Sequence, residues 1–236
     1  MLEPDATSRA PEHPGVPASR FGPDALQILT TEHWSLLATR GLVYTEAMSR
    51  TSIFIAALSG AVVALALVAQ ATDFGSGFVA FALVLLPVVY FVGWATLVRL
   101  SQVNYENARW VQGMNRIRHA YLDIAPELEP YFVTSKYDDN AGILATVMPG
   151  LGSTRAYQAL ASAPGIVAVI NAVVAGAVAG VAAMALDLGV AWSLVLGSAG
   201  FLASMGCFAA WASSRIGEFR SGHEPLFPSP PSDGSS

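Results

Sequence analysis

Four long stretches without a charged residue constrain the fold of this 236-residue chain more than any other feature. They are Thr51–Thr72, Phe74–Val98, Ala156–Leu186 and Leu188–Ser214. A bilayer core about 30 Å thick needs roughly 20 apolar residues in a helix to cross it. Each stretch is at least that long, so the sequence predicts an all-α integral membrane protein with four transmembrane helices in a lipid bilayer. Charged residues make up only 12% of the chain, against about a quarter in soluble domains.

The cationic residues fall into three groups on one side of these stretches. They are Arg9, Arg20, Arg40 and Arg50; then Arg99, Arg109, Arg116, Arg118, Lys136 and Arg155; and finally Arg215 and Arg220. The short turns 73–77 and 187–189 contain one Asp each and no Lys or Arg. The positive-inside rule therefore predicts that both termini and the central segment are cytoplasmic. Abundant Arg and Ala are typical of a high-GC bacterial genome, so we expect a multi-pass protein of the bacterial cytoplasmic (inner) membrane.

The remaining segments are expected to form cytoplasmic extensions around two transmembrane hairpins. In order, the segments are a disordered N-terminal tail (1–23), a cytoplasmic helix (24–50), hairpin one (51–98), a cytoplasmic heptad helix (99–125), a loop with a short helix (126–164), hairpin two (165–214) and a disordered C-terminal tail (215–236). The first tail has five prolines and lacks the apolar core of a signal peptide. The last is rich in Ser and Pro, a composition typical of disorder. The helix over 24–50 can run straight into the first span.

A heptad pattern follows the second span. Its members, separated alternately by four and three residues, are Val103, Asn107, Trp110, Met114, Ile117 and Tyr121. This spacing places them along one seam of a helix, which Pro126 ends. The seam must be buried against another surface. The nearest candidate is the 24–50 helix of the same chain, and the alternative is the same helix of a second subunit.

Small residues recur at four-residue spacing within the spans. Gly60 lies in such a strip on the first span, Gly176 and Gly180 on the third, and Gly197 on the fourth. Such strips let helix backbones approach closely in lipid, where no hydrophobic effect drives helices together. We expect these glycines to pack helices within a four-helix bundle, with room for contacts between subunits of a homo-oligomer.

Residues that carry chemistry are scarce. The chain has no Gly-rich phosphate loop, no His-Glu-x-x-His motif and no nucleophile elbow. It has one cysteine, Cys207, so no disulfide can form within the chain. The sequence therefore predicts no enzyme, no catalytic residue, no cofactor and no metal site, and it predicts Asp138–Asp139 to be a polar turn. The cytoplasmic face mixes both signs of charge, which argues against nucleic-acid binding.

The spans contain no Asp, Glu, Lys, Arg or His. Such groups mark proton relays and substrate sites in carriers, so their absence argues against a proton-coupled carrier or an intramembrane hydrolase. It does not argue against a pore, because hydroxyl-lined and apolar constrictions conduct. Asn171, Ser198 and Ser59 are the candidate pore-lining residues. The alternative role for Asn171 is a hydrogen bond between helices.

Two classes of function follow. The first is an oligomeric channel or pore-type protein controlled by its cytoplasmic helices. The second is a non-conducting membrane anchor or accessory subunit that recruits a cytoplasmic protein partner. The order helix, transmembrane hairpin, long cytoplasmic helix over 24–125 resembles the plan of small two-span effector domains linked to bacterial nucleotide-signalling and conflict systems. That resemblance covers the first half of the chain, rests on no residue motif and implies membrane perforation.

Overall fold

The computed structural model describes residues 21–147, 162–221 and 224–230, and no residue in these ranges lies in a strand. The helices are α1 (Ala25–Thr72), α2 (Ser76–Ile124), the short 3-10 helix η1 (Pro126–Tyr131), α3 (Asn140–Val147), α5 (Ala163–Ala185) and α6 (Gly189–Ser221). Four of them, α1, α2, α5 and α6, are long and apolar enough to cross a membrane. The all-α class and the four apolar helices are therefore confirmed. Residues 148–161 of the expected loop and short helix (126–164) lie outside the described residues.

Helices α1 and α2 are continuous from their apolar halves into their polar halves. They contain 48 and 49 residues, which corresponds to about 70 Å each at 1.5 Å per residue and exceeds twice the thickness of a bilayer core. Helix α2 passes through Pro87 without a break and ends at Ile124, two residues before Pro126. The polar half of each helix is therefore joined rigidly to an apolar half.

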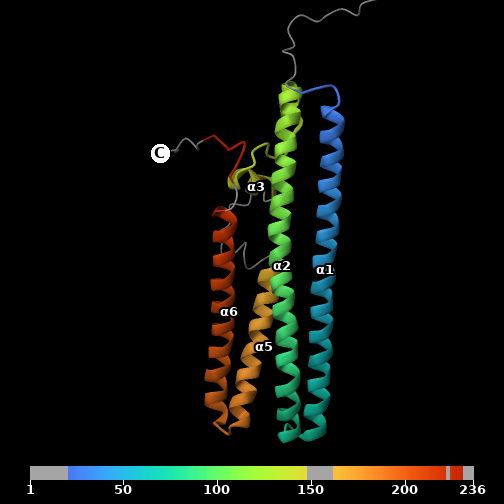
Figure 1. The fold of residues 1–236 in the computed structure, drawn as a ribbon. Coiled ribbons are helices and arrows are strands. Elements are labelled where there is room, and N and C mark those ends of the chain that lie inside the picture. Colours follow the sequence, from blue (N-terminus) through green and yellow to red (C-terminus); the bar gives the residue numbers. More distant parts are fainter. Residues whose placement is uncertain (1–20, 148–161, 222–223, 231–236) are drawn as a thin grey trace, which may run out of the picture.

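Tight turns join the helices within each pair. Asp73 and Phe74 adopt left-handed φ angles of 45° and 56° between α1 and α2. Asp187 at 55° and Gly189 at 81° form the turn between α5 and α6. Figure 1 shows both turns at the same end of the molecule, while α1 and α2 extend beyond α5 and α6 at the other end.

The four long helices form an open row. The extensive contacts join α1 to α2, α2 to α5 and α5 to α6. Contacts between α6 and α2 include an edge-to-face contact of Trp94 with Trp211 at 6.3 Å and a Tyr90 Oη to Ser204 Oγ distance of 3.4 Å. The most apolar window of α6 has no buried residue. The described chain therefore does not close into the four-helix bundle that we expected.

Helices η1 and α3 and the C-terminal segment 224–230 pack against the polar half of α2. Val111 and Met114 of α2 pack against Ile143 of α3. The C-terminal segment 224–230 lies against the residues that precede α3, and Figure 1 shows it beside α3. The expected boundary of the last tail at residue 215 differs from the structure, because α6 continues to Ser221 and residues 224–230 are held by hydrogen bonds.

Candidate functional site

Glycines make the contact between α5 and α6. A Cβ atom on Gly176 would lie 2.8 Å from the Gly197 carbonyl oxygen, and one on Gly197 would lie 3.2 Å from the Gly176 carbonyl oxygen. A Cβ on Gly180 would meet the Ser193 carbonyl oxygen at 3.4 Å, an ordinary contact. The two backbones touch at Gly176 and Gly197, so a larger residue there would separate the helices. Gly60 differs, because nothing lies within 4 Å of its Cβ position.

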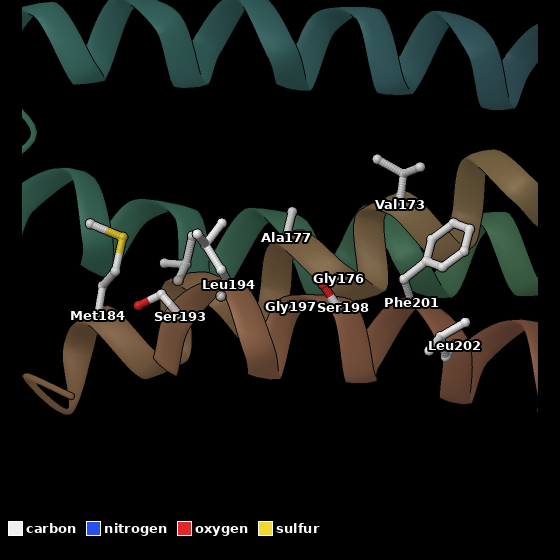
Figure 2. Close-up of a pocket in the computed structure, with 12 residues that line it drawn as sticks. Val173, Gly176, Ala177, Met184, Ser193, Leu194, Gly197, Ser198, Phe201 and Leu202 are labelled. Atoms are coloured by element: carbon white, nitrogen blue, oxygen red, sulfur yellow. The ribbon is translucent and has the colours of Figure 1, made fainter. Parts of the chain in front are cut away.

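An apolar groove of about 620 Å³ follows this contact along α5 and α6. Figure 2 shows Val173, Ala177, Met184, Leu194, Phe201 and Leu202 around it, with hydroxyls only at Ser193 and Ser198. The Ser193 hydroxyl donates to the Gly189 carbonyl oxygen at 3.1 Å. The groove presents an apolar surface of the kind that lipid chains or another apolar helix cover.

The three candidate pore-lining residues lie in three separate places. Ser198 is exposed on α6 and Ser59 is exposed on α1, at opposite ends of the helix row. Asn171 on α5 is only 1% exposed. A Cβ on Gly93 of α2 would lie 2.0 Å from its Oδ1, so the amide is packed directly against the α2 backbone. Within the described ranges, neither polar atom of the Asn171 amide has a hydrogen-bond partner.

The heptad seam of α2 faces α1 of the same chain, the first of the two predicted surfaces. Val103, Met114 and Ile117 are buried. Asn107 Oδ1 accepts a hydrogen bond from Arg40 Nε at 2.7 Å, and the Tyr121 ring stacks on His33 at 5.9 Å. Trp110 is half-buried, and its indole Nε1 has no hydrogen-bond partner among the described residues.

A cluster of ion pairs marks the border between the apolar and polar halves. Arg99 donates to both oxygens of Glu46, at 3.0 Å and 2.8 Å, and also binds Glu106 at 2.8 Å. Arg50 reaches the same Glu46 at 2.9 Å. These contacts tie α1 to α2 where charged sequence begins. Because the side chains are partly exposed, the cluster contributes only modestly to stability.

The polar end of the molecule holds its own C-terminal segment in an extended form. Residues 224–230 include Pro225, Pro228 and Pro230, which leaves only four main-chain N–H groups. Three of the four donate to a pair of carboxylates, as follows. Leu226 N donates to Asp138 Oδ2 at 3.0 Å, Phe227 N to Asp138 Oδ1 at 2.7 Å and Ser229 N to Asp139 Oδ2 at 3.0 Å. Asp138 N in turn donates to the Phe227 carbonyl oxygen at 3.1 Å.

Asp138 is the central residue of this contact, and its side chain is fully buried. Arg116 Nε donates to its Oδ2 at 2.7 Å, and Gln112 Nε2 donates to its carbonyl oxygen at 3.0 Å. Burial alone would raise the pKa of Asp138, but the hydrogen bonds from Leu226, Arg116 and Phe227 outweigh it and lower the pKa. Asp138 is therefore an ionised acceptor for main-chain N–H groups at neutral pH.

An aromatic contact accompanies the hydrogen bonds. The Phe227 ring stacks on the His119 ring of α2 with 3.9 Å between centroids. Ser229 Oγ donates to Asp139 Oδ1 at 2.7 Å. Sequence reasoning treated Asp138–Asp139 as a polar turn and the C-terminus as a tail, so it missed this site. The one local signal was the apolar pair Leu226–Phe227 between prolines.

A groove of about 690 Å³ lies beside the docked segment, between α1 and α2. It carries charges of both signs: Glu32, Glu106 and Glu224, with Arg109 and Arg116. In the described part of the chain, no group of three or more His, Cys, Asp or Glu is placed to hold a metal ion. The polar end therefore offers hydrogen-bonding and charged surface suited to a peptide or protein.

Comparison with protein-family models, with curated proteins and with solved structures finds no match for this chain.

Proposed function

We propose that this protein is a membrane-anchored interaction protein of the bacterial inner membrane. Its apolar halves form two transmembrane hairpins, and its polar end recruits a protein partner in the cytoplasm. Two features support this orientation: the turns 73–77 and 187–189 lack Lys and Arg, and both lie at the end of the molecule away from the polar halves of α1 and α2 (Figure 1).

The docked C-terminal segment carries the proposal. Peptide-recognition surfaces use main-chain hydrogen bonds for affinity and a side-chain contact for specificity. Asp138 and Asp139 bind three main-chain N–H groups, and His119 stacks on Phe227. The same surface fits an extended, proline-flanked segment of a partner that carries an aromatic residue. The chain's own segment then competes with the partner and limits its access.

The test uses a labelled synthetic peptide with the sequence of residues 224–230. The Phe227→Ala variant of the full chain weakens its own docked segment and is expected to bind the peptide more tightly than the unmodified chain does. Adding Asp138→Asn to this variant should abolish the gain. Equal, weak binding of the peptide by all three chains would contradict a recognition surface at Asp138.

The second candidate function is a homo-oligomeric pore. One observation favours it: the open row leaves both of its outer helices, α1 and α6, with exposed faces, and these faces carry Ser59, Gly60 and Ser198. A ring formed through α1 and α6 of adjacent copies would cover these faces and bring hydroxyls from several subunits together. Ion conductance in planar bilayers, together with a ring of subunits in averaged particle images, would support the pore. Zero conductance across salts and voltages would contradict the pore and favour the interaction protein.

A further inference from the structure

A second groove in the polar half of the molecule differs in chemistry from the one beside the C-terminal segment. It has a volume of about 450 Å³, lies between α1 and α2, and reaches Val147 at the end of α3. Its polar side chains are those of Arg40, Tyr44, Asn104, Asn107 and Trp110. The described residues that line this groove include no Asp, Glu or His.

The polar groups of this groove supply hydrogen-bond donors. Arg40 uses Nε to bind Asn107 Oδ1 at 2.7 Å, so the two terminal nitrogens of its guanidinium remain available as donors. Because the Asn107 oxygen is already used, its amide NH₂ is the group left for a ligand. The Trp110 indole N–H is buried and has no hydrogen-bond partner among the described residues. A buried donor in that state costs on the order of 1–3 kcal/mol unless a ligand accepts its hydrogen bond.

Within the described residues, no acid pairs with the positive charge of Arg40 in this groove. Arg99 and Arg116 each bind a carboxylate. Arg40 and Arg118, in contrast, hydrogen-bond the amide oxygens of Asn107 and Asn115 at 2.7 Å each, and neither pairs with an acid in the described part of the chain. Arg118 also lies within electrostatic range of Arg40, so the two guanidinium groups repel each other. An anion between α1 and α2 would relieve this repulsion.

We propose that this groove binds a small phosphate-bearing anion, with Arg40 and Asn107 as donors to the phosphate oxygens and Trp110 in the wall beside them. A planar guanidinium binds phosphate through two parallel hydrogen bonds. The volume falls in the range of roughly 300–1,000 Å³ seen for ligand pockets. Leu37, Val43 and Val103 supply an apolar wall for the rest of the ligand. This groove lies apart from the Asp138 contact, so the inference does not depend on the proposed partner.

The position of the groove favours a soluble ligand over a lipid headgroup. Arg40 precedes Arg50, the last charged residue before the apolar run of α1, by ten residues, which is about 15 Å along a helix. The headgroup layer on one side of a bilayer is roughly 5–8 Å thick. A lipid phosphate would have to leave that layer to reach Arg40, whereas a phosphate compound in solution would not.

The experiment measures binding of inorganic phosphate and of pyrophosphate to the full chain in detergent by calorimetry. The Kd for pyrophosphate is expected to rise at least about tenfold in Arg40→Gln, because a charge-assisted pair of hydrogen bonds is lost. Arg109→Gln is the matched control, since it removes the same charge from an exposed arginine that lines the other groove. Its Kd should stay within about twofold of the unmodified value, the size of a long-range charge effect screened by salt.

Two further measurements test whether Trp110 lines the site and whether the bound phosphate comes from a soluble compound or from a lipid. In Trp110→Phe, any pyrophosphate-dependent change of tryptophan fluorescence should disappear if the indole lines the site. Phosphatidylglycerol that copurifies with the unmodified chain but not with Arg40→Gln, without binding of free phosphate, would support the groove with a lipid as its phosphate source. The proposal would be overturned if the chain bound none of phosphate, pyrophosphate and phosphatidylglycerol. Equal losses of pyrophosphate affinity in Arg40→Gln and Arg109→Gln would overturn it as well. If Arg40→Gln does not fold, Arg40→Lys keeps the charge but not the guanidinium fork, and unchanged pyrophosphate affinity in that variant would overturn it as well.

Discussion

Replacement of Asp138 by Asn is expected to release the C-terminal segment while leaving the membrane helices folded. The carboxylate accepts three hydrogen bonds, from Leu226 N, Phe227 N and Arg116 Nε. An Asn side chain keeps one acceptor oxygen and replaces the other with an NH₂ group, which would face a donor. At least one main-chain hydrogen bond is then lost, and Arg116 loses its buried counter-charge.

The size of the effect follows from these contacts. A hydrogen bond to a charged group contributes about 1.5–3 kcal/mol, so the docked state should lose about 3 kcal/mol relative to the released state. This change corresponds to about a hundredfold increase in the released population. The amides of Leu226, Phe227 and Ser229 should exchange their hydrogens faster by about the same factor, since exchange tracks local opening.

The assay is hydrogen–deuterium exchange of the full chain in detergent, resolved by mass spectrometry on C-terminal peptides. Glu127→Gln is the matched control, because it removes one negative charge from the exposed helix η1 of the same polar end. Exchange within α5 should stay the same in both variants. Unchanged exchange of residues 226–229 in Asp138→Asn, or an equal increase in Glu127→Gln, would refute the role assigned to the Asp138 carboxylate.

Three other predictions concern the helix contacts and the pH dependence. Gly176→Leu should lower the thermal unfolding temperature in detergent, because its Cβ would lie 2.8 Å from the Gly197 carbonyl oxygen and overpacking costs about 1–3 kcal/mol; Gly60→Leu, with open space at its Cβ position, is the control. Asn171→Leu should leave stability unchanged or raise it by about 1 kcal/mol, since an amide without a partner is removed; a loss in unfolding experiments would show that the amide makes a hydrogen bond. Because the pKa of Asp138 is lowered, docking of residues 224–230 should be constant from neutral pH down through about pH 5. Docking should weaken as the pH falls below about 3.9, the ordinary pKa of an Asp side chain, toward the lowered pKa of Asp138. Hydrogen exchange of residues 226–229 measured at each pH checks this.

The four apolar helices were predictable because lipid imposes a simple requirement. Every main-chain polar group in the bilayer core must be satisfied internally, so a long apolar run can only be a helix. The contact of the heptad seam with α1 was one of two predicted outcomes, since Val103, Met114 and Ile117 had to be buried somewhere. Spacing could not choose between the two, because it says nothing of which helix lies opposite.

The arrangement of the helices and the docked segment were not predictable. Small-residue strips occur on α1, α5 and α6. Within the described chain, the strips on α5 and α6 contact each other, whereas Gly60 on α1 has no neighbour within 4 Å of its Cβ position. Which strips meet depends on the side chains of the facing helix, and the spacing of small residues within one helix does not predict those side chains. Residues 224–230 have the composition of a tail, and they are ordered by Asp138 and Asp139, which lie about 90 residues earlier in the sequence. The one local signal, the apolar pair Leu226–Phe227 between prolines, does not show which distant residues bind the segment.

The docked segment links the polar end of the molecule to the last membrane helix. Glu224 follows Ser221, the end of α6, by three residues, so its Cα lies within about 11 Å of the Cα of Ser221. The segment is then bound to Asp138, which Arg116 and Gln112 hold on α2. Elsewhere α6 packs on α5, and its side-chain contacts with α2 include Trp211 with Trp94 and Ser204 with Tyr90. A ligand that displaces residues 224–230 therefore removes a tie between α6 and α2, and it does so without touching a membrane-embedded residue.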